Sequence, residues 1–243
     1  PAGTYRVGIA FSDAIGTRKG HIVEVDSALS GQSLFALDAE ADAYLIGLGD
    51  GRVFMIEASE VVRTPLTTVD VTRSVCELTL NDTPACLVSS DPELLKQTLY
   101  RGRAIQAADT LGAAQYMLDE AVAYALDRKQ FNRVIGSFQA VKHMCAEMAS
   151  QLEPCRAFVW YAGHAFDEAA DEAALTACHA KAHLAEVGQF VAKTSTEVHG
   201  GMGFTDLVGL HYWFKRIGFN RQLLGSPEAV RQEAAVLDEL RRP

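Results

Sequence analysis

The sequence predicts an α+β protein in which a small β-domain precedes a C-terminal four-helix bundle. Up to about residue 88, short runs rich in β-branched residues alternate with turns. From Asp91 onward, apolar residues recur at helical spacing and alanine is abundant. The pattern changes within "TPACLVSSDP" (83–92). We therefore predict a β-domain over residues 1–88 and a helical bundle over residues 89–243.

Three runs in the first half are predicted to form strands: residues 20–26, 43–58 and 74–81. Within the second run, Asp50-Gly51 separates two apolar segments. An Asp-Gly pair in that setting is typical of a tight turn between antiparallel strands. We therefore expect a hairpin inside residues 43–58.

Four helices are predicted after the boundary. The first has a clear start at Asp91-Pro92-Glu93, which supplies an N-cap acceptor, a proline at the first helical position and an acid in the first turn. Pro154 is expected to kink or break the second helix. Small residues dominate the first and third helices and permit close helix approach. The predicted helices cover residues 91–130, 137–164, 171–198 and the segment after Ser226-Pro227-Glu228.

The composition limits the function classes. The 243 residues are 49% hydrophobic and 22% charged, as in an ordinary globular protein, and a net charge of −9 argues against a nucleic-acid partner. No apolar run approaches the roughly 20 residues that cross a bilayer. The N-terminal "PAGTYRVG" lacks a signal-peptide pattern, and the five scattered cysteines suit reduced thiols. We expect a cytoplasmic protein without a membrane partner.

Metal and thiol chemistry have little support. His179 and His183 have the spacing of metal ligands on one helix face, with Glu186 a turn further on, but the H-E-x-x-H pattern is absent. Two histidines on a helix surface are the simpler interpretation. The cysteines lack a neighbouring histidine or basic residue in sequence, and no G-x-G-x-x-G or phosphate-binding loop occurs. We expect no metal site.

Two segments carry the residues that indicate a ligand. In "ALDRKQFNRVIGSFQAVKH" (125–143), a predicted helix ends near Arg128, Phe131 follows, and Gln139 begins the next helix. This could be a solvated helix end, yet an arginine, a ring and an amide beside one turn suit a dinucleotide. Gly200-Gly201 ends another helix, and adjacent glycines either cap a helix or let a ligand approach the backbone.

"YALDRKQFNRVIGSFQAVKHMCAEM" (124–148) and "EVHGGMGF" (197–204) resemble the C-terminal helical domain of acyl-CoA dehydrogenases. That family has an Arg-x-x-Phe-Gly turn, a following Phe/His-Gln pair and a Gln-x-x-Gly-Gly-x-Gly element in the same order. The resemblance covers about residues 93–222 well. It covers residues 20–90 weakly, as part of the family's middle β-domain, and leaves the family's N-terminal helical domain without a counterpart.

The resemblance implies that these elements hold the ADP part of FAD bound to a neighbouring subunit. Arg128 would contact the pyrophosphate, Phe131 the adenine side and Gln139 the ribose-adenine region, while Gly200 and Gly201 give backbone approach. Glu197 stands where the family usually has glutamine, so one amide donor is lost. The implied cofactor-binding residues are Arg128, Gln130, Phe131, Gln139, Glu197, Gly200 and Gly201.

The resemblance also locates two positions for the family's catalytic carboxylate, and neither holds an acid here. Leu224 occupies the usual position after the Gly-Gly element, and Gly102, just before Arg103, occupies the alternative. Asp109 and Glu228 are the remaining acids that could act as a base. The flavin-covering Trp-x-Thr/Ser strand would fall at residues 31–42, where there is no tryptophan.

These features resemble the non-catalytic subunit of an actinobacterial α2β2 heterotetramer that acts in steroid catabolism. We expect this chain to complete the FAD site of a full-length homologue and to help shape a site for a bulky acyl-CoA, while the homologue supplies the base and holds the acyl-CoA. An electron-transfer acceptor is a further expected partner. Two alternatives remain open. One is a homo-oligomeric dehydrogenase with an unusual base, and the other is a flavin-free scaffold.

Overall fold

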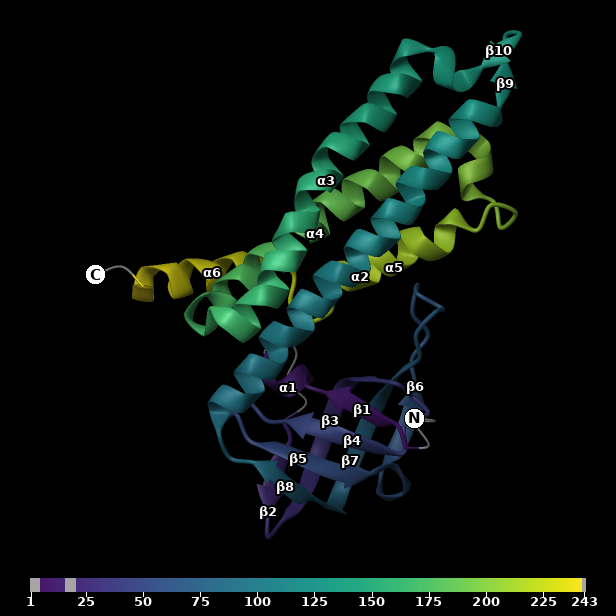
Figure 1. Cartoon of the computed structure of the whole chain (residues 1–243). Helices are drawn as coiled ribbons and strands as arrows, with labels where there is room; N and C mark the ends of the chain where they lie inside the picture. Colours follow the sequence, from purple (N-terminus) through teal and green to yellow (C-terminus); the bar gives the residue numbers. More distant parts are fainter. Residues whose placement is uncertain (1–4, 16–20, 242–243) are drawn as a thin grey trace. The chain divides into compact units, whose positions relative to one another are not determined.

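The computed structural model describes residues 5–15 and 21–241, and the chain divides into two compact units (Figure 1). The first unit is Pro1–Thr98 and the second is Leu99–Pro243. The long helix α2 (Pro92–Asp127) therefore begins in the first unit and runs on through the second. Each unit is described by itself.

The first unit is built on an eight-stranded sheet with the order β6-β7-β3-β1-β4-β5-β8, in which β2 also pairs with β3. Within residues 5–15 and 21–98, β1 and β4 pair in parallel and the other strand pairings are antiparallel. A short helix α1 (Ser12–Ile15) and a 3₁₀ turn η1 (Ala58–Glu60) connect strands. The strands are β1 (Val7–Ala10), β2 (Val23–Val25), β3 (Ala28–Leu37), β4 (Ala43–Gly47), β5 (Val53–Glu57), β6 (Val62–Pro65), β7 (Val75–Pro84) and β8 (Cys86–Ser89).

The predicted hairpin is confirmed. β4 and β5 pair antiparallel from Ala43↔Glu57 to Gly47↔Val53, and Leu48 accepts and donates backbone hydrogen bonds across the turn. Gly51 has a φ of 93°, which explains why glycine follows Asp50 in the turn. The run 74–81 forms most of β7. The run 20–26 contributes only β2, and its first residue lies outside the described residues.

The sheet unit has a core of its own. Its largest fully buried side chains are Leu29 on β3, Tyr44 and Ile46 on β4, Ile56 on β5, and Leu78 and Leu80 on β7. β4 is buried along almost its whole length, as expected of a strand in the middle of a sheet. This core is separate from that of the helices.

The second unit is helical. All four predicted helices are present: three agree with the predicted bounds to within a few residues, and the fourth begins at Pro227 as expected. Two features differ: α3 continues through Pro154, so the break expected there does not occur, and α5 was not predicted. The helices after α2 are α3 (Gln139–Glu168), α4 (Ala170–His199), α5 (Leu210–Gln222) and α6 (Pro227–Arg241), with 3₁₀ turns η2 (Ile135–Ser137) and η3 (Gly200–Phe204).

α4 is the central helix of this unit, buried along most of its length and packed on α3, α5 and α6. Met117, Met148, Leu184 and Ile217 fill the core between these helices. α2 and α4 come so close that a Cβ on Gly188 would lie 2.6 Å from Thr110 Cγ2. The small residues of these two helices therefore permit the close approach that their sequence predicts. Among the described residues, no helix is long and apolar enough to cross a membrane.

Candidate functional site

A short hairpin between α2 and α3 carries Gln130 and Phe131 of the predicted cofactor residues, with Arg128 directly before it and Gln139 at the start of α3 (Figure 1). It consists of β9 (Lys129–Gln130) and β10 (Arg133–Val134), paired antiparallel. Phe131 and Asn132 form the two-residue turn, with φ of 51° and 59°. Positive φ at both positions is typical of a type I′ turn, which asparagine tolerates and a bulky residue rarely adopts. The hairpin therefore holds an aromatic ring at its tip in a conformation that phenylalanine disfavours.

The side chains available at this tip are a cation, a ring and an amide. Phe131 is 87% exposed. Arg128 and Gln139 are also exposed, and neither side chain makes a hydrogen bond or an ion pair with the described residues. Gln130 is exposed as well, and its amide donates to the Lys129 carbonyl oxygen at 2.9 Å. Arg128, Phe131 and Gln139 are thus free to contact a ligand or another chain.

Neighbouring groups stiffen the tip. The Arg133 guanidinium lies 3.9 Å from the centre of the Phe138 ring, and the Phe131 ring meets the same ring edge to face at 6.2 Å. Gly136 lies so close to α2 that a Cβ there would be 2.9 Å from the Ala125 carbonyl oxygen. Residues 128–142 carry four basic side chains and no acidic one, in a chain of net charge −9. The tip therefore has a local excess of positive charge, which favours an anionic group over a cationic one.

Gly200 and Gly201 follow α4 directly, and none of the residues that the structure describes fills the space where their Cβ atoms would be. A Cβ added at either glycine would meet no atom within 4 Å. Gly200 has φ 58° and ψ −139°, a conformation that favours glycine. Gly203 differs, because a Cβ there would lie 2.7 Å from the Thr196 carbonyl oxygen. Packing within the chain therefore explains why residue 203 is a glycine, but it does not explain Gly201. The backbone at Gly201 is open to a group from outside the chain.

The hairpin and the two glycines belong to the same end of the helical unit. The Tyr124 ring, in the last turn of α2, stacks on the ring of His199, the last residue of α4, with centroids 4.5 Å apart. Ser195 Oγ donates to the Met117 carbonyl oxygen at 2.7 Å, which joins the same two helices. Glu197 is exposed one turn before Gly200. Segments far apart in the sequence thus place the predicted cofactor residues at one edge.

The two positions expected for a catalytic carboxylate also come together, and both are apolar. A Cβ on Gly102, in α2, would lie 2.7 Å from Leu224 Cδ1. Leu224 follows α5 and has a φ of 59°, which is rare for a residue with a branched side chain. The absence of a side chain at Gly102 therefore makes room for Leu224. Neither residue can accept a proton.

A buried arginine holds the Leu224 backbone in place. Arg103, only 5% exposed, donates from Nε to the Leu224 carbonyl oxygen at 3.0 Å. Its other nitrogens contact Glu233 Oε2 at 2.8 Å and Cys178 Sγ at 3.3 Å. Burial raises the pKa of the Cys178 thiol to about 11, so this cysteine is a neutral hydrogen-bonding partner and no nucleophile. Arg103 thus links α2, α4, α6 and the loop before α6.

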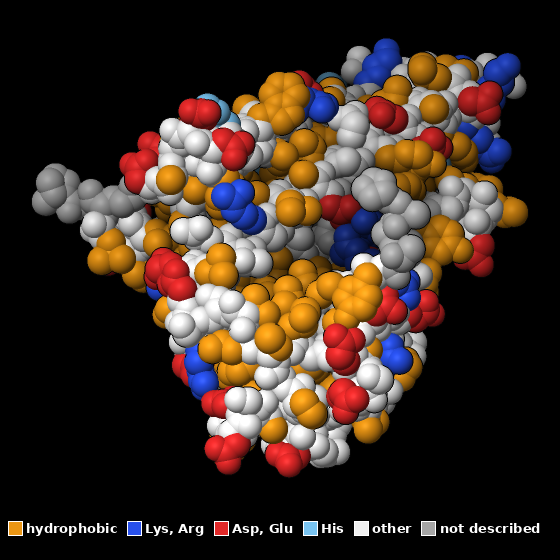
Figure 2. Space-filling model, turned by 60° about the horizontal axis from the view of Figure 1, so that its bottom comes forward, with side chains coloured by type: hydrophobic (Ala, Val, Ile, Leu, Met, Phe, Trp, Pro, Cys, Tyr) orange, Lys and Arg blue, Asp and Glu red, His pale blue; other side chains and the backbone are white. Residues whose placement is uncertain are grey.

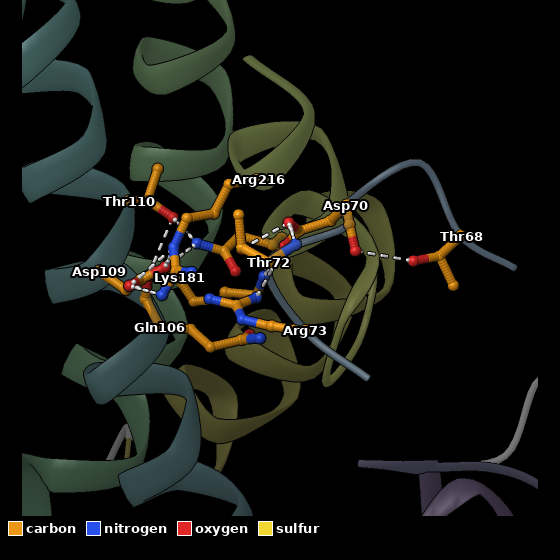
Figure 3. A network of polar contacts seen from close by, with 10 residues as sticks. Thr68, Asp70, Thr72, Arg73, Gln106, Asp109, Thr110, Lys181 and Arg216 are labelled. Carbon is orange, nitrogen blue, oxygen red and sulfur yellow. Dashed lines mark hydrogen bonds and ion pairs between the residues drawn. The ribbon is translucent and has the colours of Figure 1, made fainter. Parts of the chain in front are cut away.

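Asp109 is engaged in an ion pair (Figure 3). It extends from α2 toward Arg216 of α5, whose Nη2 and Nε lie 2.6 Å and 3.0 Å from its two carboxylate oxygens. Asn220 Nδ2 donates to the same carboxylate at 2.6 Å, and buried Lys181 donates to the Asn220 carbonyl oxygen. The sequence interpretation missed these partners. Arg216 and Asn220 lie more than a hundred residues from Asp109, and Lys181 belongs to α4.

Glu228 lies in the first turn of α6 and is exposed. Backbone and Ser226 hydrogen bonds at the helix start lower the pKa of its carboxyl, and Arg221 Nη2 lies 3.1 Å from its Oε1. A general base gains from a raised pKa, so this environment suits a helix-capping carboxylate better. Asp109 and Glu228 are therefore both occupied with structural partners.

The histidines of α4 have separate surroundings. The His183 ring lies 5.1 Å from that of Phe158, and Glu186 pairs with Arg221 at 2.8 Å. His179 is exposed. Among the described residues, no group of three or more histidine, cysteine or acidic side chains could hold a metal ion.

Residues 93–235 match the family described as "Acyl-CoA dehydrogenase, C-terminal domain", over more than half of the chain. The chain belongs to the acyl-CoA dehydrogenase family. The resemblance and the α+β fold expected from the sequence are therefore confirmed. In this family fold, the hairpin tip, the two glycines and the Gly102–Leu224 contact all lie within or directly beside the matched residues.

Two mycobacterial relatives illustrate the match. "Acyl-CoA dehydrogenase IpdE2" of Mycobacterium tuberculosis is 34% identical over 167 residues, which cover 68% of this chain and 48% of the relative. "Acyl-CoA dehydrogenase FadE34" of the same species is 32% identical over 194 residues, covering 77% of this chain and 26% of the relative. The chain thus spans less than half the length of these curated acyl-CoA dehydrogenases.

Solved acyl-CoA dehydrogenases share the fold of both units. The "Tcur3481-Tcur3483 steroid ACAD G363A variant" superposes with a TM-score of 0.86 at 27% identity, covering 98% of this chain and 68% of that one. Butyryl-CoA dehydrogenase from Megasphaera elsdenii gives a TM-score of 0.87 at 20% identity, with 98% and 69% coverage. The likeness therefore extends over the sheet unit as well as the helices.

Proposed function

We propose that this chain is the non-catalytic subunit of a heteromeric, FAD-dependent acyl-CoA dehydrogenase. One observation carries the proposal. The positions for a catalytic carboxylate are filled by Gly102 and Leu224, which face each other, while the cofactor-binding edge keeps its exposed arginine, ring and open glycines. A chain that loses its base but keeps a ligand edge is suited to completing a site on another subunit.

The residues at the hairpin tip fit the ADP part of FAD. The Arg128 guanidinium can pair in a forked fashion with a pyrophosphate, and Phe131 offers a face to a purine. Gln139 and Gln130 supply amides, and Gly200 and Gly201 leave the backbone open. Glu197 is the poorest fit, since a carboxylate near phosphate repels it. FAD, when bound, supplies the acceptor for the hydride that leaves the acyl β-carbon.

The α-proton needs a carboxylate from elsewhere. Leu224 has no basic atom, Asp109 is held by Arg216 and Asn220, and Glu228 has a lowered pKa. We therefore assign proton removal to a full-length homologue, which would also hold the flavin ring and the acyl-CoA. This is why we favour a heteromer over a homo-oligomer with an unusual base.

The substrate class and partner are inferred from the relatives. The Tcur3481-Tcur3483 structure is named as a steroid enzyme and carries two gene designations, which supports a two-component assembly and a bulky acyl group. Exposed apolar side chains are also numerous, and Figure 2 shows many on one face of the molecule. Such surface is typical of a chain that binds another protein. A cytoplasmic heterotetramer that passes electrons to a separate acceptor follows from the same family argument.

Co-purification tests the proposal against its alternatives. We expect this chain to bind a full-length homologue encoded beside it, and the complex to contain FAD and oxidise a steroid acyl-CoA. Neither chain alone should do both. Flavin and turnover in the isolated chain would favour a homo-oligomer with its own base. A stable complex whose flavin content does not depend on this chain would favour a flavin-free scaffold.

A further inference from the structure

Gln106 is a buried polar side chain without a partner. It lies on α2, is 6% exposed, and neither its Nε2 nor its Oε1 has a hydrogen-bonding partner in the described structure. Buried amides are almost always hydrogen-bonded, and an unsatisfied one costs free energy that an apolar side chain of similar size would not. Packing alone therefore does not account for a glutamine here.

The polar groups nearest in sequence are already engaged. Thr110 Oγ1 donates to the backbone carbonyl of Gln106 at 2.9 Å and accepts from Asn220 Nδ2 at 3.1 Å. Asp109 is paired with Arg216. Figure 3 shows that Gln106 extends away from the Asp109–Arg216 pair instead of joining it. Asp109, Thr110, Arg216 and Asn220 thus bond one another, and the Gln106 amide takes no part in this network.

Gln106 also lies one helical turn after Gly102. Residues four apart share a helix face, and a helical side chain leans toward the preceding turn. Its amide is therefore on the side of α2 where Gly102 meets Leu224 Cδ1. One face of α2 thus carries both the apolar Gly102–Leu224 contact, which cannot transfer a proton, and the Gln106 amide, which can donate and accept hydrogen bonds.

We propose that Gln106 binds a hydroxyl group on the acyl part of an acyl-CoA held at this chain's own base-free position, without turnover. This inference rests on the proposed function, since it takes acyl-CoA as the ligand class. A hydroxyl oxygen accepts from Nε2 while its hydrogen is donated to Oε1, so one group satisfies both amide atoms. A keto oxygen would satisfy only Nε2. Leu224 would contact the apolar part of the same ligand.

Binding to the intact complex with its homologue tests this inference. The probes are the CoA thioesters of cholic acid, which carries hydroxyl groups, and of cholanic acid, which carries none. The wild-type complex should bind cholyl-CoA about tenfold more tightly at a site additional to the catalytic one, as one satisfied buried amide requires. Gln106→Leu should abolish that preference. Turnover at the partner's site should stay unchanged.

A matched control and a stability measurement complete the design. Gln115→Leu removes another glutamine of α2, one that bonds Asp119 and Arg156, and should leave the ligand preference as in the wild type. Gln106→Leu should leave the melting temperature unchanged or raise it, because it removes an unsatisfied buried amide. A fall in melting temperature would instead identify Gln106 as a structural residue and overturn the proposal.

Two further outcomes would overturn it. One is an equal affinity of the wild-type complex for both thioesters, and the other is a preference that survives Gln106→Leu. A loss of turnover in Gln106→Leu would place the amide at the catalytic site and contradict a separate, silent one. Loss of FAD or failure to assemble in the wild type would contradict the proposed function instead, so the two failures are distinguishable.

Discussion

Leucine 224 keeps a backbone conformation that its side chain disfavours. With a φ of 59° it occupies the left-handed region, and Arg103 Nε fixes its carbonyl oxygen at 3.0 Å. The surroundings thus hold Leu224 in a sparsely populated backbone conformation, although its side chain can neither donate nor accept a proton. Gly102 is coupled to it, since any Cβ on α2 at that point would collide with Leu224 Cδ1.

Arg128→Ala should deplete the complex of FAD without dissociating its subunits. Truncating a desolvated arginine paired with a phosphate costs about 2–5 kcal/mol, which weakens cofactor binding by well over tenfold. Excess FAD should restore part of the activity, because the proposed assembly assigns the base and the flavin-ring contacts to the partner. Flavin content after gel filtration and the FAD dissociation constant measure the effect.

Arg231→Ala is the control for this change, because Arg231 is an exposed arginine of α6 with one long contact to Glu186. It should keep the flavin content of the wild type. If the Arg128→Ala complex retains its flavin with unchanged affinity, Arg128 does not bind the pyrophosphate, and the hairpin is only a helix connection.

Asp109→Asn and Glu228→Gln should each leave turnover of the complex within a few-fold. Removal of a general base costs about 10²–10⁴-fold, so steady-state kinetics separate the two cases clearly. The variants should differ in stability. Asp109→Asn weakens the pair with Arg216 and should lower the free energy of unfolding by about 1–3 kcal/mol. A large loss of turnover from either variant would return proton removal to this chain.

At the scale of elements, the sequence predicted the helices and strands that carry local signals such as caps and tight turns. The start of α2 has its cap, and Asp91 Oδ1 accepts from the Glu93 backbone N–H at 2.9 Å. α5 lacks such signals, because it starts after Gly209 in a left-handed conformation without a side-chain cap. Pro154 does not end α3 because it lies on the exposed side, where the carbonyl it leaves unpaired can bind water.

The candidate site likewise contains one part that the sequence predicted and one part that it did not. Arg128, Phe131 and Gln139 lie close together in the sequence, so a family resemblance could name them together. The meeting of Gly102 with Leu224 and the ion pair of Asp109 depend on contacts between distant helices. Local patterns carry no information about such contacts. They also give no hint that Gln106 is unpartnered.

Gly188→Ala should destabilise the helical unit. The added Cβ would lie 2.6 Å from Thr110 Cγ2, where α2 and α4 pack most closely, so one helix must shift. Overpacking of this kind costs about 1–3 kcal/mol, measured by denaturant unfolding. Gly112→Ala is the matched control, since nothing lies within 4 Å of its added Cβ. That change should be neutral or stabilise by up to about 1 kcal/mol, because alanine is the better helix former. Equal effects of both substitutions would contradict close packing at Gly188.

At the scale of the whole molecule, the chain exposes much apolar surface. Trp160 on α3 is 70% exposed, and Phe204 and Leu207 near η3 are 79% and 85% exposed. Figure 2 shows apolar side chains on the surface among acidic ones. Such a surface is expected of a chain that works in a complex.

The isolated chain should therefore self-associate or be poorly soluble, and co-expression with a full-length homologue should give a heterotetramer. Covering the apolar surface removes the drive to self-associate, so solubility should rise with complex formation. Size-exclusion chromatography with light scattering measures both states. A well-behaved monomer that binds no such homologue would count against the assembly.

The Arg103 contacts also bear on the order in which the chain folds. Arg103 and Leu224 are 121 residues apart, and Tyr100 donates to Glu233 across 133 residues. The hairpin at residues 129–134 closes over a few residues, so its loop-closure entropy is small. Contacts of long sequence separation form late in folding. Refolding should therefore complete the hairpin before the Leu224 loop closes. During synthesis, the hairpin can therefore form before α6 is available to pair with Arg103.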